Sequence, residues 1–479
     1  MTAGDPRRSG RWLRRSSATF VVLVLALAGV AYQFDLGRRL GLDTPSPVTE
    51  PFEVAPPPGL TLPTPRPAPL VAAETTDRAA APRMVRRALS GLVSDKKLGR
   101  RVSVAVSQLA DGRSVYRTGA GLVTPASTMK LLTSAAALES LGPDHRFRTA
   151  VVSRPRSGWV VLVGGGDPFL ERAQAPRDRL YPVRADLNTL ARATAAALEE
   201  RGRTAVRLGY DTSLFSGPAV SPAWESSYVP DDVVSPVSAL WTNEGRTRSG
   251  SVTSDPAAAA AQGFARALAR QQIDVLGEPS PTRAAAGADE LAAVESAPLE
   301  RIVERVLEVS DNEASEVLFR HVAVATGKRA SFAGASAAVR SVLDRVGVDM
   351  SGAQIFDGSG LSRENRLAPE TLLSVIEVSA GDEHVLLRPV ITGLPVAGFN
   401  GSLAYRFETG DARGPGRVRA KTGTLTGVHG LAGVVTDLEG TELAFVALAD
   451  RVKLVNTLDA RAMLDEVTAA LAGCACGRT

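Results

Sequence analysis

Three short motifs carry residue types that together could perform acyl transfer. They are Ser127-Thr128-Met129-Lys130, Ser310-Asp311-Asn312 and Lys421-Thr422-Gly423, in that order along the chain. The set supplies a hydroxyl nucleophile, two amines, a second hydroxyl, a side-chain amide and a strand that could bind an oxyanion. An acyl-transfer enzyme that uses serine and lysine without histidine needs these groups. Each motif alone is a weak signal, and the ordered set is a strong one.

The first motif lies where a helix is expected to begin. Pro125 precedes Ser127, and an apolar stretch runs from Met129 to Leu138, so we expect the serine in the first turn of this helix. The i, i+3 spacing then places the Lys130 amine on the same face as the Ser127 hydroxyl. Burial and a nearby second cation are expected to lower the pKa of Lys130, so that it can act as general base. Taken alone, the motif would be read as an ordinary helix start.

Lysine is rare in this chain, which makes the motif lysines stand out. There are six lysines, and the remaining 49 basic residues are arginines. Arginine does not give up its proton in proteins, whereas a buried lysine can, so a base built on an amine requires lysine. Ser94-Asp95-Lys96-Lys97 has the same spacing as the first motif but no apolar helix after it, and we do not expect a site there.

The second motif interrupts two predicted helical segments, Leu299 to Val309 and Glu313 to Val324. Serine, aspartate and asparagine are good helix caps, so a cap is the structural alternative. In the functional interpretation, Ser310 relays a proton to the leaving amine, and Asn312 hydrogen-bonds a substrate amide.

The third motif is expected on a strand from Arg417 to Leu425. Lys421 and Thr422 suit a terminal carboxylate, and Gly423 would let a substrate backbone approach the strand closely. The N–H groups of Thr424 and Ser127 would form the oxyanion hole. The alternative is an edge-strand lysine followed by a turn.

The strands and helix that position these motifs are predicted in two distant parts of the chain, before the first motif and after the third. Strands are predicted at 101–109, 114–117, 429–436 and 441–449, and a closing helix is predicted at 455–471. This pattern predicts an α/β (α+β) domain, centred on an antiparallel sheet and split by an insertion. Within the insertion we expect a strand from Trp159 to Gly164 and a helix from Ala257 to Ala269. The glycine run Gly164–Pro168 is expected to be a tight turn rather than a phosphate-binding loop.

The N-terminal region has the composition of an export segment followed by a linker. Five arginines precede an apolar run from Ala18 to Tyr32, which predicts a signal peptide or membrane anchor over residues 1–33. Proline-rich residues 34–83 predict a disordered linker. We expect a catalytic domain over 84–149 and 291–472, an inserted domain over 150–290 and a tail over 473–479. The body would then lie outside the cytoplasmic membrane, with membrane contact only through the N-terminal segment.

Composition excludes several other classes of function. The net charge is +4, but residues 1–40 alone carry +5, so the body is near neutral and no nucleic acid is expected as partner. The four histidines have no metal-ligand spacing, and no metal or cofactor is expected. Cys474 and Cys476 are too close for an unstrained loop-closing disulfide and are expected to lie in the tail.

Taken together, the motifs resemble those of penicillin-binding proteins and serine β-lactamases. More narrowly, residues 85–472 resemble the low-molecular-mass class C penicillin-binding proteins, which are D-alanyl-D-alanine carboxypeptidases and endopeptidases. Besides the three motifs and the long insertion, the narrower resemblance rests on Gly164–Pro168, on Pro236–Leu240 before Asn243, on Asp357–Ser362 and on Lys421–Leu425.

The resemblance implies a transpeptidase-like catalytic domain, an acyl-serine intermediate, acylation by penicillin and no cofactor. It implies that Ser127, Lys130, Ser310, Asn312 and Lys421 take the roles given above. The chain departs from the family in two ways. Ser315-Glu316 stands where the family tends to have Ala-Glu, and the insertion is shorter than in the largest members.

The expected function is therefore an extracytoplasmic serine D-alanyl-D-alanine carboxypeptidase, and also a D,D-endopeptidase, that acts on peptidoglycan stem peptides and is inhibited by β-lactam antibiotics. A serine β-lactamase is the nearest alternative enzyme, but no Glu-x-x-Leu-Asn is found between Asn312 and Lys421. A penicillin-binding wall scaffold that never turns over is the alternative from another class, since intact motifs do not prove turnover.

Overall fold

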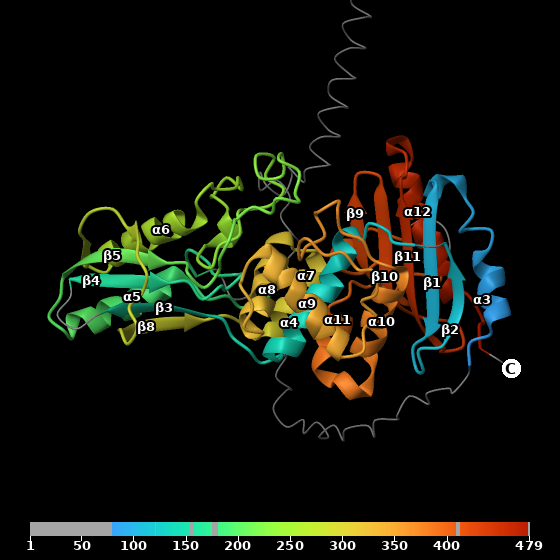
Figure 1. Cartoon of the computed structure of the whole chain (residues 1–479), viewed down its shortest axis with the longest axis horizontal. Helices are drawn as coiled ribbons and strands as arrows, with labels where there is room; N and C mark the ends of the chain where they lie inside the picture. Colours follow the sequence, from blue (N-terminus) through green and yellow to red (C-terminus); the bar gives the residue numbers. More distant parts are fainter. Residues whose placement is uncertain (1–78, 120, 154–157, 175–180, 409–411, 478–479) are drawn as a thin grey trace, which may run out of the picture. The chain divides into compact units, whose positions relative to one another are not determined.

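The computed structural model describes residues 79–119, 121–153, 158–174, 181–408 and 412–477, which form two sheets and their covering helices (Figure 1). The predicted export segment at 1–33 and most of the predicted linker at 34–83 lie outside the described residues. Among the helices of the described ranges, none is both long and apolar enough to cross a bilayer.

The first sheet is antiparallel and joins two distant parts of the chain. Its strands, in the spatial order β2-β1-β11-β10-β9, are β2 (Ser114–Thr118), β1 (Arg101–Gln108), β11 (Glu442–Asp450), β10 (Val428–Thr436) and β9 (Val418–Leu425). Arg101 pairs with Asp450 and Gln108 pairs with Leu443, so β1 lies beside β11 along its whole length (Figure 1). The predicted strands and the antiparallel sheet are confirmed.

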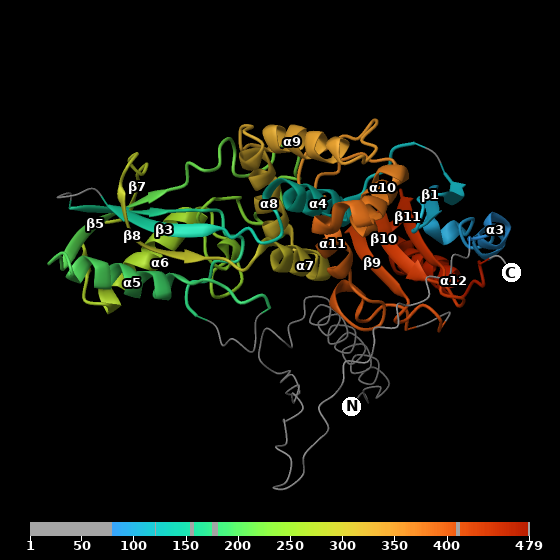
Figure 2. The ribbon, with the colours of Figure 1, turned by 90° about the horizontal axis from the view of Figure 1, so that it is seen from below.

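Both faces of this sheet are buried, which explains why its central strands are almost wholly apolar. In β11, Leu443, Phe445 and Ala447 pack with α3 (Pro82–Leu89) and α12 (Thr457–Ala472). The alternate residues Ala444, Val446 and Leu448 pack with α4 (Met129–Leu141) and α10 (Pro369–Ala380). Figure 2 shows α10 and α12 on opposite sides of the strands. The predicted closing helix is confirmed, although its first residues, Leu454–Asn456, form a 3-10 turn.

Helix α4 is the central element of the helical layer. Every residue from Met129 to Leu138 is buried, so this part of the helix is enclosed on all sides, and its few polar side chains include Lys130. It is surrounded by α7 (Leu299–Val309), α8 (Asn312–Ala325), α9 (Phe332–Arg345) and α11 (Arg388–Thr392). The first motif is therefore held at the start of a helix that is enclosed by other helices.

The second sheet lies within the segment between the first and second motifs and has its own core. Its strands are β3 (Arg148–Ser153), β4 (Trp159–Val163), β5 (Ala205–Asp211), β6 (Asp274–Val275), β7 (Ser280–Pro281) and β8 (Asp289–Glu295). Helices α5 (Leu187–Glu199) and α6 (Pro256–Arg270) pack against it. The strand predicted from Trp159 and the helix predicted from Ala257 are confirmed.

The glycine run that follows β4 is occupied by contacts within the protein. The Gly164 N–H donates to the Asp211 carbonyl at 2.9 Å, and the Gly166 N–H donates to the Ala239 carbonyl at 2.8 Å. The Gly166 carbonyl lies 2.9 Å from His321 Nε2. These contacts support the prediction that the run is a tight turn rather than a phosphate-binding loop. The N–H groups of Gly164 and Gly166 already donate to carbonyl groups of the protein.

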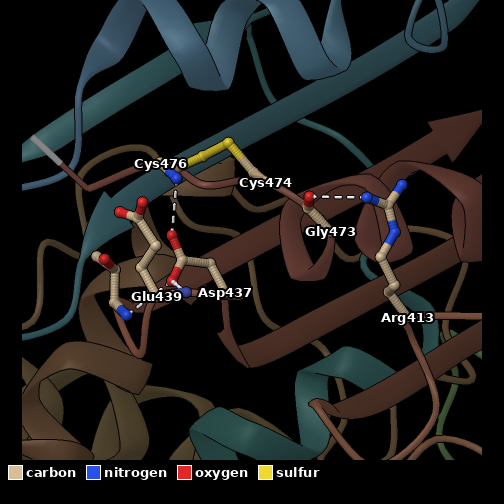
Figure 3. Close-up of a disulfide and its surroundings, with 7 residues drawn as sticks. Arg413, Asp437, Glu439, Gly473, Cys474 and Cys476 are labelled. Atoms are coloured by element: carbon tan, nitrogen blue, oxygen red, sulfur yellow. Dashed lines mark hydrogen bonds between the residues drawn. A yellow bond between two sulfur atoms is a disulfide. The ribbon is translucent and has the colours of Figure 1, made fainter. Parts of the chain in front are cut away.

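The prediction for the two cysteines is wrong. Cys474 and Cys476 form a disulfide with their Cα atoms 5.0 Å apart, inside the usual range of about 4.4–6.8 Å. The Cys476 N–H donates to Asp437 Oδ2 at 2.8 Å, and the Leu438 N–H donates to the Cys474 carbonyl at 3.2 Å (Figure 3). Both cysteines are buried in the core beside α12. The chain here is a packed segment and not a tail, because the hairpin between β10 and β11 binds its backbone.

The same segment also fixes the start of the folded body. The Ala81 N–H donates to the Cys476 carbonyl at 2.7 Å, Ala80 pairs with Gly477, and the Ala80 N–H donates to Gln108 Oε1 at 3.0 Å. The packed structure therefore includes Ala80 and Ala81, which precede the predicted boundary at residue 84.

Replacing Cys474 and Cys476 together with serine is expected to lower the free energy of unfolding by about 1–2 kcal/mol, because the closed loop is short. Thermal unfolding of the full chain, with and without reductant, measures this loss. The serine variant should be insensitive to reductant and should keep its acylation rate. Equal stability of the two oxidised proteins would contradict the expectation.

Candidate active site

The Ser127 hydroxyl is presented on a tight turn. Ala126–Thr128 form a 3-10 turn that runs directly into α4, and Ala126 has a φ of 48°. The Thr128 hydroxyl donates to the Pro125 carbonyl at 2.7 Å and stabilises the turn. The sequence predicted Ser127 in the first turn of the α-helix. In the structure it lies in the 3-10 turn just before that helix. Lys130 Nζ nevertheless lies 3.0 Å from Ser127 Oγ, as the i, i+3 spacing requires.

Lys130 is fully buried and is held by three acceptors. Besides Ser127 Oγ, its Nζ donates to Asn312 Oδ1 at 2.8 Å and to the Ser359 carbonyl at 2.7 Å. Burial lowers the pKa of Lys130 from its ordinary value to about 8, while the carboxylates of Glu316 and Asp357 act in the opposite direction. Loss of hydration, rather than the second cation, is therefore the cause of the depressed pKa.

The second motif serves both as a helix cap and as part of the site. Ser310 ends α7 with a φ of 65°, and Asp311 caps α8 by accepting the Ala314 N–H at 2.9 Å. The reversal of chain direction points Ser310 and Asn312 toward the two lysines. Lys421 Nζ donates to Ser310 Oγ at 2.8 Å, and Asn312 Oδ1 accepts from Lys130. The structural alternative and the functional interpretation are therefore compatible.

The third motif lies on β9, at the edge of the first sheet. Lys421 is buried, and burial together with the charge of Lys130 holds its pKa well below the ordinary value. The Thr422 hydroxyl donates to Ser402 Oγ at 2.9 Å, a contact that no sequence signal indicated.

Strand alternation places the Thr424 N–H on the open edge of β9. The Ala420 N–H points away from β10, since it donates to the Pro395 carbonyl at 3.0 Å. In an antiparallel strand alternate residues share this direction, so the N–H groups of Thr422 and Thr424 point the same way. The Thr424 N–H therefore has the orientation that an oxyanion donor on this edge requires.

Gly423 has a structural role besides the predicted one in substrate approach. A Cβ atom at this position would lie 2.8 Å from the Pro125 carbonyl oxygen, so the absent side chain lets the serine turn pack on β9. The glycine brings the nucleophile and the oxyanion strand together, in addition to any effect on the substrate.

A loop from Asp357 to Ser362 completes the floor of the site. Asp357 accepts hydrogen bonds from Trp224 Nε1 at 2.8 Å, from Asn365 Nδ2 at 2.6 Å, and from the N–H groups of Gly360 and Ser362. This loop supplies the Ser359 carbonyl to Lys130. Its motif contributed to the family resemblance, but the sequence assigned it no contact with the lysine.

One group of carboxylates beside the second motif has the geometry of a cation site. Oxygen atoms of Glu244, Asp311 and Glu313 all lie within 4.8 Å of one another. Arg246 pairs with Glu313 at 2.5 Å, and Arg184 lies 3.8 Å from Glu244. Arg184 also pairs with Glu171 at 2.6 Å, so the two guanidinium groups offset only part of the negative charge, and the carboxylates form part of an ion-pair network.

The family model that matches the chain is the D-Ala-D-Ala carboxypeptidase 3 (S13) family, over residues 85–253 and 247–471. The chain is 35% identical over 478 residues to the carboxypeptidase DacB of Mycolicibacterium smegmatis, covering 98% of this chain and all of that one. The chain belongs to the D-Ala-D-Ala carboxypeptidase 3 (S13) family. It is also 33% identical to a carboxypeptidase of Mycobacterium tuberculosis, over 92% of this chain and 94% of that one.

Among solved structures, the S13 chain is similar to penicillin-binding protein 4 (dacB) of Haemophilus influenzae. The TM-score is 0.65 at 22% identity, covering 80% of this chain and 98% of that one. This likeness confirms the predicted fold class. Membership of the S13 family confirms the predicted resemblance and the predicted enzyme class, a serine-type D-Ala-D-Ala carboxypeptidase. The comparisons favour neither the β-lactamase nor the scaffold.

Proposed function

We propose that this S13 enzyme removes D-alanine from the D-Ala-D-Ala end of peptidoglycan stem peptides through an acyl-enzyme on Ser127. The observation that carries the proposal is the pairing of each motif lysine with a motif serine: Lys130 with Ser127 at 3.0 Å and Lys421 with Ser310 at 2.8 Å. The first pair supplies a nucleophile, Ser127, and a base, Lys130. The second pair supplies a proton relay, Ser310, so that no histidine is needed. The relatives named as carboxypeptidases support the substrate class.

In the acylation step, Ser127 Oγ attacks the carbonyl carbon of the penultimate D-alanine and transfers its proton to Lys130. Negative charge develops on the carbonyl oxygen, where the N–H groups of Ser127 and Thr424 would stabilise it. The C–N bond then breaks, and Ser310 donates a proton to the departing amine. Ser310 then takes up the proton that Lys130 accepted, which returns Lys130 to its neutral form before deacylation. Lys421 orients the Ser310 hydroxyl for this transfer, because its Nζ donates to Ser310 Oγ at 2.8 Å.

Substrate recognition falls to the same residues. Lys421 and Thr422 would bind the terminal carboxylate, and Asn312 would bind an amide of the peptide. In deacylation, water attacks the ester, and Lys130 is the group placed to accept its proton. A β-lactam mimics the acyl donor, so we propose that it acylates Ser127 as well.

Two finer points belong to the same proposal. The enzyme would also cleave D-alanyl cross-links, as a D,D-endopeptidase, since the scissile bond has the same chemistry. It would act outside the cytoplasmic membrane, attached to it only by the N-terminal segment. Cell fractionation with and without residues 1–33 tests the attachment.

The intact mass of the full chain, followed after addition of benzylpenicillin, tests the nucleophile. We expect one penicilloyl adduct, mapped to Ser127 by peptide analysis. The Ser127→Ala variant should form none and should release no D-alanine from a pentapeptide. An adduct at another residue, or none on folded protein with intact penicillin, would refute the assignment.

A further inference from the structure

Glu316 is a buried carboxylate that the mechanism above leaves without a role. It is fully buried and lies on α8, four residues after Asn312, so it faces the same side of the helix as the site. Burial and the nearby Asp357 carboxylate raise the pKa of Glu316, while hydrogen bonds from Gly358 and Ser359 lower it. Burying a carboxylate costs free energy unless hydrogen bonds or opposite charges stabilise it. The groups that contact Glu316 therefore show what its charge stabilises.

The Glu316 carboxylate accepts hydrogen bonds from backbone donors of the loop that carries the Ser359 carbonyl. Its Oε1 accepts the Ser359 N–H at 2.8 Å and the Gly358 N–H at 3.1 Å, and its Oε2 accepts the Gly358 N–H at 3.0 Å. Three N–H···O contacts favour the ionised form, because each group is a donor.

The peptide between Gly358 and Ser359 is held from both sides. Glu316 binds its N–H, while the Gly358 carbonyl accepts the hydroxyls of Thr133 at 2.7 Å and Ser315 at 2.8 Å. The next carbonyl along the chain, that of Ser359, is the one that accepts Lys130 Nζ at 2.7 Å. This carbonyl belongs to the following peptide, whose Gly360 N–H donates to Asp357 Oδ1 at 3.0 Å. Glu316 and Asp357 therefore hold the peptides on the two sides of Ser359 and together orient its carbonyl toward Lys130.

The other charged groups near Glu316 are engaged elsewhere. Asp357 is bound by four donors, as described above. The terminal guanidinium nitrogens of Arg320, which lies one turn further along α8, donate to the carbonyls of Ser216, Pro218 and Ala330. The Glu316 carboxylate nevertheless acts to raise the pKa of Arg320, so this guanidinium also favours the ionised form of Glu316.

Lys130 is faced by several charges of both signs. The carboxylates of Glu316, Asp357, Asp311 and Glu313 favour its charged form, and Glu316 has the largest such effect. Glu313 is directly paired with Arg246, which reduces its influence. Lys421 is the facing cation.

We propose that Glu316 is a positioning residue for the carboxypeptidase reaction: it orients the Ser359 carbonyl against Lys130, and its negative charge stabilises the Lys130 ammonium formed when Ser127 gives up its proton. The proposal rests on the proposed function of Lys130 as general base. It assigns a task to the Ser315-Glu316 position, at which the chain departs from the family pattern only in its first residue.

The Glu316→Gln variant separates charge from geometry. A glutamine oxygen in place of Oε1 can still accept both N–H groups, so the loop should be retained while the charge is lost. Without the carboxylate, Lys130 loses its proton more readily, and the acid limb of kcat/KM should move to lower pH by about one unit. The weaker base should also lower kcat.

Direct titration of Lys130 gives a readout that does not require turnover. The chain has only six lysines, so a carbon-13 lysine label gives a simple NMR spectrum, and Lys130→Arg identifies the signal. The titration midpoint of Lys130 should fall in Glu316→Gln. Glu313→Gln is the matched control, a buried carboxylate on the same helix, and should shift the midpoint less.

The outcomes separate the two proposals. A Glu316→Gln variant that loses activity with an unmoved acid limb and an unmoved Lys130 midpoint has lost only packing, and the inference is overturned. A wild-type enzyme that releases no D-alanine would overturn the proposed function, while the NMR titration would still test Glu316.

Glu316→Asp keeps the negative charge but shortens the side chain, so kcat should fall while the acid limb of kcat/KM stays at the same pH. If the glutamine variant does not fold, an unchanged kcat in Glu316→Asp overturns the positioning role.

Discussion

Replacing Lys130 with arginine is expected to slow acylation of Ser127 about 100- to 10,000-fold, the usual contribution of a general base. Arginine keeps the positive charge among the acceptors Ser127, Asn312 and Ser359 but does not release its proton. The measurement is the rate of penicilloyl adduct formation on the full chain by intact mass.

Lys421→Arg is the matched control, because it places the same change on the second buried lysine. Lys421 is proposed to bind a carboxylate, which requires charge rather than proton loss. Its variant should therefore raise KM more than it lowers kcat. A Lys130→Arg enzyme within tenfold of the wild-type rate would exclude Lys130 as the base.

The pH dependence of the wild-type enzyme follows from the same group. Because burial lowers the pKa of Lys130 to about 8, the neutral amine is the minor form below that pH and the major form above it. The value of kcat/KM should therefore fall as the pH is lowered through about 8. Lys130→Arg should lack this limb.

Replacing Gly360 with alanine is the second change with a large expected effect. Gly360 has a φ of +86°, and a Cβ atom there would lie 1.9 Å from the Ala126 carbonyl oxygen. The left-handed backbone costs about 1–2 kcal/mol for alanine, and relieving the clash costs about 1–3 kcal/mol more. Because Ala126 precedes the nucleophile, the relief must displace the serine turn, and acylation should fall together with stability.

Gly347→Ala separates backbone strain from the clash. Gly347 has a φ of +85°, but a Cβ atom there meets nothing within 4 Å. It should lower the free energy of unfolding by about 1–2 kcal/mol and leave acylation unchanged. Chemical denaturation and the adduct assay compare the two variants. Equal acylation by both would show that Gly360 does not support the serine turn.

The sequence predicted the parts of the site whose geometry is local. The spacing of Ser127 and Lys130 fixes their distance once a helix follows, and the cap residues at Ser310–Asn312 mark a break between helices. Turn residues at Asp111-Gly112 and Asp437–Gly440 located two of the three hairpins of the first sheet; the third joins β9 to β10. In each case the information lies within about ten residues.

The remaining contacts depend on packing between distant segments. The Ser359 carbonyl lies 229 residues from Lys130 along the chain, and the hydroxyl of Ser402 reaches Thr422 from a separate loop. Neither the hydrophobic periodicity of the sequence nor the spacing of its motifs predicts contacts between residues so far apart. The disulfide was missed for a related reason, because the conformation around Cys474 and Cys476 is set by the Asp437 hairpin rather than by their separation.

The position of β1 beside β11 has a consequence for how the enzyme becomes active during synthesis. The strand that carries Lys421, and both strands that connect it to β1, emerge after some three hundred residues that follow β1. Until then β1 has only its hairpin partner β2, and a two-stranded hairpin is marginally stable in water. Pairings this far apart in sequence form slowly. The nascent chain consequently has neither a finished sheet nor a second catalytic amine, and peptidase activity begins only when the last strands pair.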